Sequence, residues 1–156
     1  MIIKSCMKRN VISIPVEGTV AEAARVFVKH HVGVLPVVNA EGKPVGILRV
    51  RDLLTLELPD FVNLVEDVDF VHDFGAVETT RPASELLARP VTSLMQPVLT
   101  VGEDCGLLRA YSMMLKDDLQ DIPVTDARGV LVGIASRVDV ATAVLSSWQE
   151  RKGKAT

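Results

Sequence analysis

The chain contains one stretch of sequence twice, because residues 11–54 reappear at residues 98–141 with a constant offset of 87. Two copies are too few for a solenoid, and each copy is too small to bury a full hydrophobic core alone. We therefore expect the copies to pack face to face around a pseudo-twofold axis. Seven identical residues anchor the repeat: Pro36, Val37, Gly42, Val45, Gly46, Ile47 and Asp52 match Pro123, Val124, Gly129, Val132, Gly133, Ile134 and Asp139.

Each copy has the pattern of a small α/β unit. In the first copy, Thr19 and Glu22 have the spacing of a capping box, and apolar residues then keep helical spacing up to Gly33. Short runs rich in β-branched residues predict strands. The expected order is a strand at 11–14, a helix after Thr19, strands at 35–38 and 45–50 joined as a hairpin, and a helix from Asp52.

The second copy repeats this order, with strands at 98–101, 122–125 and 130–136 and helices at 107–116 and about 139–151. The predicted fold class is therefore α/β (α+β), with two β-α-β-β-α repeats packed as one module. The predicted boundaries are 1–54 for the first repeat, 55–91 for an insertion, 92–152 for the second repeat and 153–156 for a tail.

Composition narrows the functional classes. The chain has 156 residues, of which 48% are hydrophobic and 24% charged, and its net charge is −3. This describes one compact domain without the basic surface that nucleic acid requires. No apolar stretch reaches the ~20 residues of a membrane span, and the N-terminus lacks the layout of a signal peptide. We expect a cytoplasmic protein with no nucleic-acid or membrane partner.

Metal and redox chemistry find no support in the sequence. Cys6 and Cys105 have no Cys-x-x-Cys spacing, and His30, His31 and His72 have no ligand partners at a recognisable spacing. We expect reduced cysteines, surface histidines and no metal.

The order and spacing of the repeated motifs resemble a tandem pair of cystathionine-β-synthase (CBS) domains, also called a Bateman module. The residues that carry this resemblance are 32–39, with the sequence Val-Gly-Val-Leu-Pro-Val-Val-Asn, the turn at 46–52, and the turn Gly-Ile-Ala-Ser-Arg-Val-Asp at 133–139. The resemblance covers nearly the whole chain outside residues 55–91. It implies a binding module for AMP, ADP, ATP or S-adenosylmethionine, with the ligand in a cleft between the copies.

The resemblance implies that the turn ending in Asp139 contacts ribose and phosphate. An Asp at a strand-to-helix turn can accept bonds from both ribose hydroxyls, Ser136 and free backbone N–H groups can face a phosphate, and Arg137 can add charge. The same residues also make an ordinary helix N-cap, which is compatible with binding. Superposition on the family pattern adds Ile12 and Val11 for the adenine, Gly33 and Val34 beside it, and Met7 as a wall of the cleft's mouth.

The first copy departs from the family pattern. Arg49 stands where Ser or Thr is usual, although Asp52 remains, and Leu99 is the counterpart of Ile12. Arg49 can fill an empty site by pairing with Asp52, or it can bind a phosphate bidentately. We therefore expect one good site around Asp139 and a possible second site at Asp52, Arg49 and Leu99.

The insertion, residues 55–91, is the part of the chain that the repeat does not account for. Pro59 can start a helix whose apolar stripe runs from Phe61 to Phe74, and no Lys or Arg lies between Arg51 and Arg81. An acidic, solvated surface helix or a partner contact fits this pattern. Residues 84–89 predict a second short helix, and residues 91–95 resemble the segment at the start of the first repeat, residues 4–7.

Catalysis finds little support, because the sequence has no nucleophile–base set in a plausible order and no phosphate-binding loop. We expect a non-enzyme without a catalytic cofactor. The favoured function is a stand-alone adenosyl-ligand sensor that acts through a homodimer or an unidentified regulated protein. The alternative is a ligand-free scaffold that uses the repeats and the acidic helix for assembly.

Overall fold

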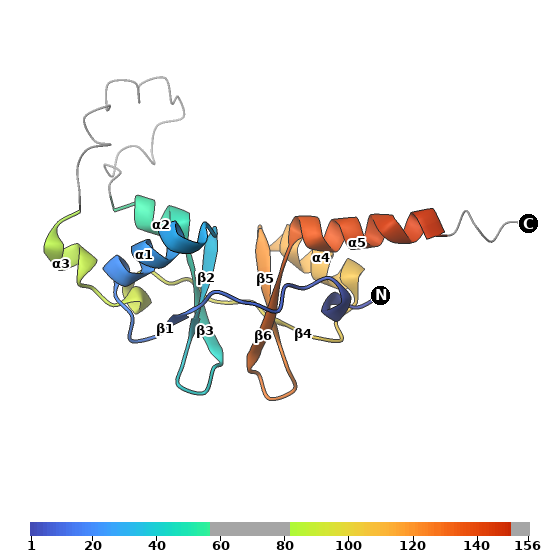
Figure 1. Ribbon diagram of the computed structural model, residues 1–156, viewed down its shortest axis with the longest axis horizontal. Helices are drawn as coiled ribbons and strands as arrows, with labels where there is room; N and C mark the ends of the chain where they lie inside the picture. Colours follow the sequence, from blue (N-terminus) through green and yellow to red (C-terminus); the bar gives the residue numbers. More distant parts are fainter. Residues whose placement is uncertain (57–81, 151–156) are drawn as a thin grey trace, which may run out of the picture.

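A computed structural model describes residues 1–56 and 82–150 and contains two copies of one α/β unit side by side (Figure 1). The first copy comprises β1 (Ile14–Pro15), α1 (Val20–His30), β2 (Val34–Val38), β3 (Pro44–Arg49) and α2 (Val50–Leu54). The second comprises β4 (Val101–Gly102), α4 (Leu107–Lys116), β5 (Asp121–Thr125), β6 (Leu131–Ser136) and α5 (Arg137–Glu150). The predicted fold class and element order are confirmed.

The remaining described elements precede the repeats' first strands. They are two 3₁₀ turns, η1 (Ile3–Ser5) and η5 (Val91–Ser93), and the short helix α3 (Ser84–Leu87). The helix expected from Pro59, its acidic face and His72 lie outside the described residues. No helix in the described ranges is long and apolar enough to cross a membrane.

The two sheets have the same topology. In each, the middle strand is parallel to the first and antiparallel to the third, giving the orders β1-β2-β3 and β4-β5-β6. The predicted bounds of the first strands were wrong. Only Ile14 and Pro15 pair with β2, and only Val101 and Gly102 pair with β5, because the residues before them cross between the repeats instead of joining a sheet.

The helix starts follow from local capping. The predicted capping box is confirmed, since Thr19 Oγ1 accepts from Glu22 N at 3.2 Å and Glu22 Oε2 accepts from Thr19 N at 3.0 Å. α1 ends before Gly33, at a left-handed C-cap on His31. α2 and α5 begin two residues before the predicted Asp52 and Asp139, because each Asp is the third helical residue and its carboxylate accepts from a backbone N–H three residues earlier.

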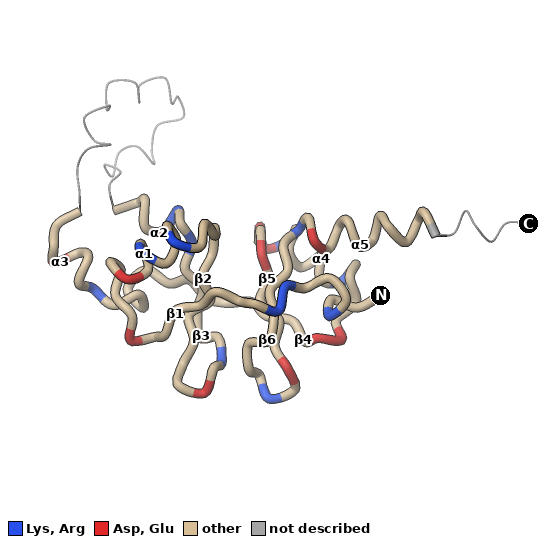
Figure 2. The backbone as a smooth tube through the Cα atoms, viewed as in Figure 1, with Lys and Arg blue, Asp and Glu red and all other residues tan. Residues whose placement is uncertain are grey.

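The repeats exchange the segments that precede their first strands. We call residues 3–8 and 91–96 the leading segments. Lys8 and Ile134 exchange two backbone hydrogen bonds of 2.8 and 2.9 Å, and Gln96 and Ile47 do the same. The segment before repeat 1 therefore pairs with β6 of repeat 2, and the segment before repeat 2 pairs with β3 of repeat 1. Figures 1 and 2 show both crossings at the centre of the molecule.

Apolar packing reinforces this exchange. Ile3 and Met7 lie in the core of repeat 2, whereas Val91 lies in the core of repeat 1. The close approach needs glycine in the receiving strand, because a Cβ on Gly133 would lie 2.5 Å from the Met7 sulfur. Gly46 faces Met95 in the same way. Each repeat is thus completed by residues that precede the other.

This exchange makes a stability prediction. Ile3→Ala should lower the free energy of unfolding by about 2–5 kcal/mol, because Ile3 is fully buried and its loss leaves a cavity in the core of repeat 2. Ile2→Ala is the control, since the neighbouring Ile2 is 40% exposed. Hydrogen exchange of the Ile3→Ala variant should quicken in α4 and β5 more than in α1 and β2. The opposite pattern would contradict the exchange.

Candidate functional site

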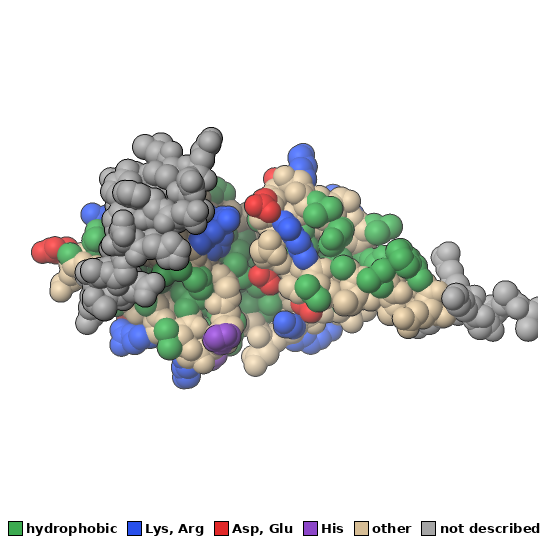
Figure 3. All heavy atoms as spheres, turned by 90° about the horizontal axis from the view of Figure 1, so that it is seen from above, with side chains coloured by type: hydrophobic (Ala, Val, Ile, Leu, Met, Phe, Trp, Pro, Cys, Tyr) green, Lys and Arg blue, Asp and Glu red, His purple; other side chains and the backbone are tan. Residues whose placement is uncertain are grey.

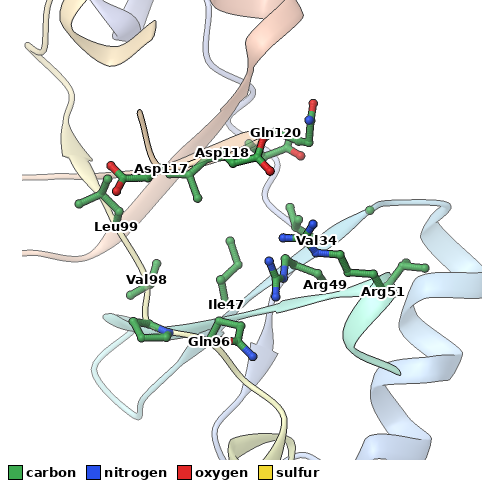
Figure 4. Close-up of a pocket in the computed structure, with 15 residues that line it drawn as sticks. Val34, Ile47, Arg49, Arg51, Gln96, Val98, Leu99, Asp117, Asp118 and Gln120 are labelled. Atoms are coloured by element: carbon green, nitrogen blue, oxygen red, sulfur yellow. The ribbon is translucent and has the colours of Figure 1, made fainter. Parts of the chain in front are cut away.

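The crossings leave a cavity of about 670 Å³ between the repeats (Figure 4). Repeat 1 supplies the start of β2 and the turn from β3 into α2, and repeat 2 supplies the segment that crosses toward β4 and the connection from α4 to β5. The lining residues are Gly33, Val34, Ile47, Arg49, Val50, Arg51, Gln96, Pro97, Val98, Leu99, Asp117, Asp118, Leu119, Gln120 and Asp121.

One part of this cavity is apolar and has open backbone. Val34, Ile47, Val98 and Leu99 present aliphatic side chains to it. Within the described part of the chain, Val98 and Leu99 form no backbone hydrogen bond, since they lie between the Gln96–Ile47 bridge and β4. Their N–H and C=O groups are therefore accessible to a flat, polar-edged group that fits between aliphatic side chains.

Arg49 and Asp52 form a bidentate ion pair beside the cavity. Asp52 Oδ2 accepts from Arg49 Nε at 2.9 Å and from Arg49 N at 2.8 Å, and Asp52 Oδ1 accepts from Arg49 Nη2 at 2.7 Å. Asp52 is only 7% exposed. The hydrogen bond to Asp52 is the main cause of a raised pKa for Arg49, which stays cationic. The sequence offered two hypotheses for Arg49, namely pairing with Asp52 or bidentate binding of a phosphate. The structure contains the pair with Asp52.

Acidic side chains lie across the cavity from the arginines. Arg49 and Arg51 point into it from repeat 1, and Asp117 and Asp118 lie on the opposite wall (Figure 4). Asp118 also adds to the raised pKa of Arg49 through its charge. Asp121 completes the acidic side, so charges of opposite sign face each other across the space.

The pseudo-equivalent turn of repeat 2 has a different arrangement. Asp139 Oδ2 accepts from Ser136 N at 2.9 Å, and Ser136 Oγ accepts from Asp139 N at 3.0 Å, so the pair caps α5. Lys8 Nζ lies 3.9 Å from Asp139 Oδ2. Asp139 Oδ1 accepts no hydrogen bond from a described residue, so one oxygen of this carboxylate is open where both oxygens of Asp52 are taken.

Asp121 is half-buried near this second turn. Burial raises its pKa, the positive charge of Lys8 lowers it, and the negative charge of Asp139 raises it further. Asp121 therefore links the cavity to the turn of repeat 2, because it lines the cavity at Arg49 and its pKa also responds to the charges of Lys8 and Asp139.

Only some of the residues expected at a ligand site lie together in the structure. Gly33, Val34, Arg49 and Leu99 meet in the cavity, although Gly33 and Val34 were expected beside Asp139. Val11 and Ile12 lie on the segment that crosses between the repeats, where Ile12 packs against the core of repeat 1.

Two further expected residues have other tasks. Met7 does not wall the mouth of a cleft, because it is 8% exposed and packs in the core of repeat 2. The Arg137 guanidinium donates to the carbonyls of Leu119 and Met114 and to Asp118 Oδ1 at 3.0 Å, so it ties α5 to the end of α4 instead of facing a phosphate.

Sequence reasoning missed several lining residues, including Ile47, Arg51, Gln96 and Asp118. The sequence did contain the information needed to find them. The family pattern pairs the turn at Asp139 with the first-strand region of the other copy, and the same pairing applies when the two copies are exchanged. Applied to the turn at Arg49, it leads to residues 98–99 and to the start of β5.

Comparison with known proteins agrees with this architecture. A family model for the CBS domain matches residues 3–58 and 91–146. The chain belongs to the CBS domain family. Among the described residues, no group of three or more His, Cys, Asp or Glu side chains is placed to hold a metal ion.

Relatives in sequence are distant but cover most of this CBS pair. A protein of Methanocaldococcus jannaschii is 27% identical, with 93% of this chain and 92% of the relative aligned. CBSX2 of Arabidopsis thaliana, a chloroplastic CBS domain-containing protein, is 29% identical, with 92% of this chain and 62% of CBSX2 aligned. The chain also spans only 57% of a Methanopyrus kandleri relative.

Solved structures share the CBS-pair fold. The crystal structure of CBSX2 in complex with AMP has a TM-score of 0.68 at 26% identity and covers 93% of this chain and 96% of that chain. The CBS pair of protein MJ0100 from a complex with 5′-methylthioadenosine and S-adenosylmethionine has a TM-score of 0.68 at 20% identity, with 94% and 98% covered, and shows the fold alone.

The difference between the two turns predicts unequal stability losses. Asp52→Asn should lower the free energy of unfolding by about 2–3 kcal/mol, because a neutral amide disrupts the bidentate bonds to a cation. The matched Asp139→Asn should cost about 1 kcal/mol, because Asn still caps the helix. Urea unfolding of both variants measures the difference, and equal losses would mean that the Arg49 pair contributes little.

Asp121 predicts a pH-dependent stability. Its folded pKa lies above its ordinary value of 3.8, so the folded state holds the proton more tightly than the unfolded state. The wild type should lose stability as pH rises from 3.8 through the raised pKa, and Asp121→Asn should remove this loss. In urea unfolding, the free energy of unfolding of Asp121→Asn should therefore increase relative to that of the wild type as the pH rises from ~3 to ~7. Asp104→Asn, at an exposed position, is the charge-matched control; an equal gain there would contradict the assignment.

Proposed function

We propose that this CBS pair is a regulatory, non-catalytic module that binds an adenosyl ligand, namely AMP, ADP, ATP or S-adenosylmethionine, between its repeats. The observation that carries the proposal is the cavity of about 670 Å³ with an aliphatic part and charged walls. Its volume lies in the range of about 300–1,000 Å³ that small-molecule sites occupy. The complex of the similar CBSX2 with AMP supports the ligand class.

The adenine lies in the apolar part of the cavity. Ile47 and Leu99 contact its faces, and the open backbone groups of Val98 and Leu99 read its polar edge. The ligand's tail then extends toward Arg49 and Arg51. Gly33 and Val34 border the cavity at the start of β2.

The turn at Asp139 is a second candidate site, favoured by one specific observation. Asp139 has an oxygen that accepts no bond from the described residues, and a ribose hydroxyl can donate to it. Ser136 caps the same turn, and Val11 and Ile12 lie on the crossing segment of the opposite repeat. Arg137 does not take part, because its guanidinium is held by α4.

The ligand signal passes through assembly. Figure 3 shows apolar side chains gathered over the helices of repeat 2. These helices form a surface on which a homodimer, or a regulated partner protein, can pack in the cytoplasm. A ligand shifts the balance between two packings in proportion to its differential affinity for them. The exposed apolar residues on α4 and α5 are Leu108, Leu115, Val138, Leu145 and Trp148.

The scaffold alternative also has an observation in its favour. Arg49 occupies both oxygens of Asp52, so this CBS turn is satisfied without a ligand. In that case the repeats serve assembly only, together with the acidic insertion.

Calorimetric titration with AMP, ADP, ATP and S-adenosylmethionine tests the proposal. Leu99→Trp fills the cavity at Arg49, and its pseudo-equivalent Ile12→Trp fills the cleft at Asp139; both positions are half-buried. In a matching unfolding experiment, a ligand at a concentration of 100 times its dissociation constant should raise the free energy of unfolding of the wild type by about 2.7 kcal/mol. Leu99→Trp should abolish both the binding and this gain in stability.

The pair of variants separates the sites. If Ile12→Trp alone abolishes binding, the ligand occupies the Asp139 cleft. Failure of all four ligands to bind the wild type would overturn the sensor and leave the scaffold.

A further inference from the structure

The cavity at Arg49 carries both signs of charge on separate walls. Arg49 and Arg51 come from the end of β3 and the start of α2, and Asp117, Asp118 and Asp121 come from the connection between α4 and β5. Figure 2 shows the basic and acidic stretches on opposite sides of the boundary between the repeats, and Figure 4 shows Asp118 across the space from Arg49 and Arg51, with Asp117 farther along the same wall beside Leu99.

The total charge around this cavity is negative. Two of the groups are already paired outside the space, since Arg49 is bound by Asp52 and Asp118 by Arg137. With these partners included, three arginines stand against four aspartates. A nucleoside polyphosphate would place several negative charges next to carboxylates, and like charges at such distances repel.

The arginine wall suits a single carboxylate. Asp52 holds the Arg49 guanidinium through Nε and Nη2, and the Nη1 edge donates to no residue in the described ranges, so it can donate to a ligand. A guanidinium fixed in this way is a preorganised hydrogen-bond donor to a planar anion, and Arg51 adds a second donor set on the same wall. Asp117 and Asp118 offer acceptors to a cation on the opposite wall.

We infer that this cavity binds an adenosyl ligand with a zwitterionic amino-acid tail in preference to nucleoside polyphosphates. The carboxylate of the tail lies at Arg49 and Arg51, and its cationic centres lie toward Asp117 and Asp118. S-adenosylmethionine has this chemistry and is the probe. The inference rests on the proposed function and assigns the ligand class to one of its two sites.

The internal symmetry supplies a comparison within the same molecule. The offset of 87 relates Asp117 and Asp118 to His30 and His31. The relation holds in the backbone, because Asp118 and His31 share a left-handed φ of 51° and 52°. The pair of aspartates at 117 and 118 therefore has no symmetry-related counterpart, since the first copy carries histidines at both positions, and this acidic pair belongs to the cavity at Arg49 alone.

The test is calorimetric titration of the full chain with S-adenosylmethionine and with ATP. The variant is Asp117→Asn/Asp118→Asn, which neutralises two exposed side chains; asparagine tolerates the left-handed backbone of Asp118. The control is Glu17→Gln/Asp104→Asn, which makes the same change in net charge at two exposed, pseudo-equivalent positions outside the cavity lining.

The wild type should bind S-adenosylmethionine more tightly than ATP. The Asp117→Asn/Asp118→Asn variant should weaken S-adenosylmethionine and strengthen ATP by about 3- to 10-fold each, since exposed charge pairs are screened by water. The control should change either affinity by less than about 2-fold. Leu99→Trp should abolish the binding of S-adenosylmethionine.

Two results would overturn the inference while the proposed function stands. The first is tighter binding of ATP than of S-adenosylmethionine by the wild type, and the second is an equal effect of the variant and its control. If no adenosyl ligand binds the wild type at all, the inference and the proposed function fail together.

Discussion

The exchange of leading segments is the constraint on which the rest of the structure depends. Each third strand, β3 or β6, is flanked on one side by its own middle strand and on the other by a segment that precedes the opposite repeat, joined at Ile47–Gln96 and Ile134–Lys8. Met95 and Met7 lie against Gly46 and Gly133 at these joints. Neither core is complete without residues from the segment that precedes the other repeat, so each repeat depends on the other for its packing. The same crossings carry residues 9–13 and 97–100 between the sheets, and residues 97–99 form a wall of the cavity.

The pseudo-twofold symmetry of the fold does not extend to the chemistry of its clefts. At the turn into α5, Ser136 and Asp139 together cap the helix, and one oxygen of the Asp139 carboxylate accepts no bond from the part of the chain that the structure describes. At the turn into α2, Arg49 donates to both oxygens of the buried Asp52. The Asp52 carboxylate therefore holds the arginine cation in place and is not available to accept from a ligand hydroxyl. One residue difference between two copies of a motif thus changes which hydrogen-bonding groups the turn presents. The acidic wall at Asp117 and Asp118, where the first copy has two histidines, adds to that difference.

Much of the fold was predictable because local patterns decide it. The capping box at Thr19, the paired hairpins and the order of elements follow from residues close together in the chain, and the repeat itself implied a twofold arrangement. The predictions for the first strands, Met7 and Arg137 were wrong because long-range contacts decide these residues. Residues 11–13 look like a strand but cross between repeats, Met7 fills a core formed by residues ~100 positions later, and Arg137 reaches back to carbonyls at the end of α4.

The sequence by itself determined the repeated CBS unit, its family and the two turns that could hold a ligand, because these depend on motif order and on hydrogen bonds within three residues. Only the tertiary structure decided which side chains meet in space. It brought Gly33, Val34, Arg49 and Leu99 into one cavity and set the arginines across from Asp117 and Asp118. The physical reason is the exchange of leading segments: a cleft between two repeats is formed by residues distant in the chain, and backbone pairing between the repeats sets their relative positions.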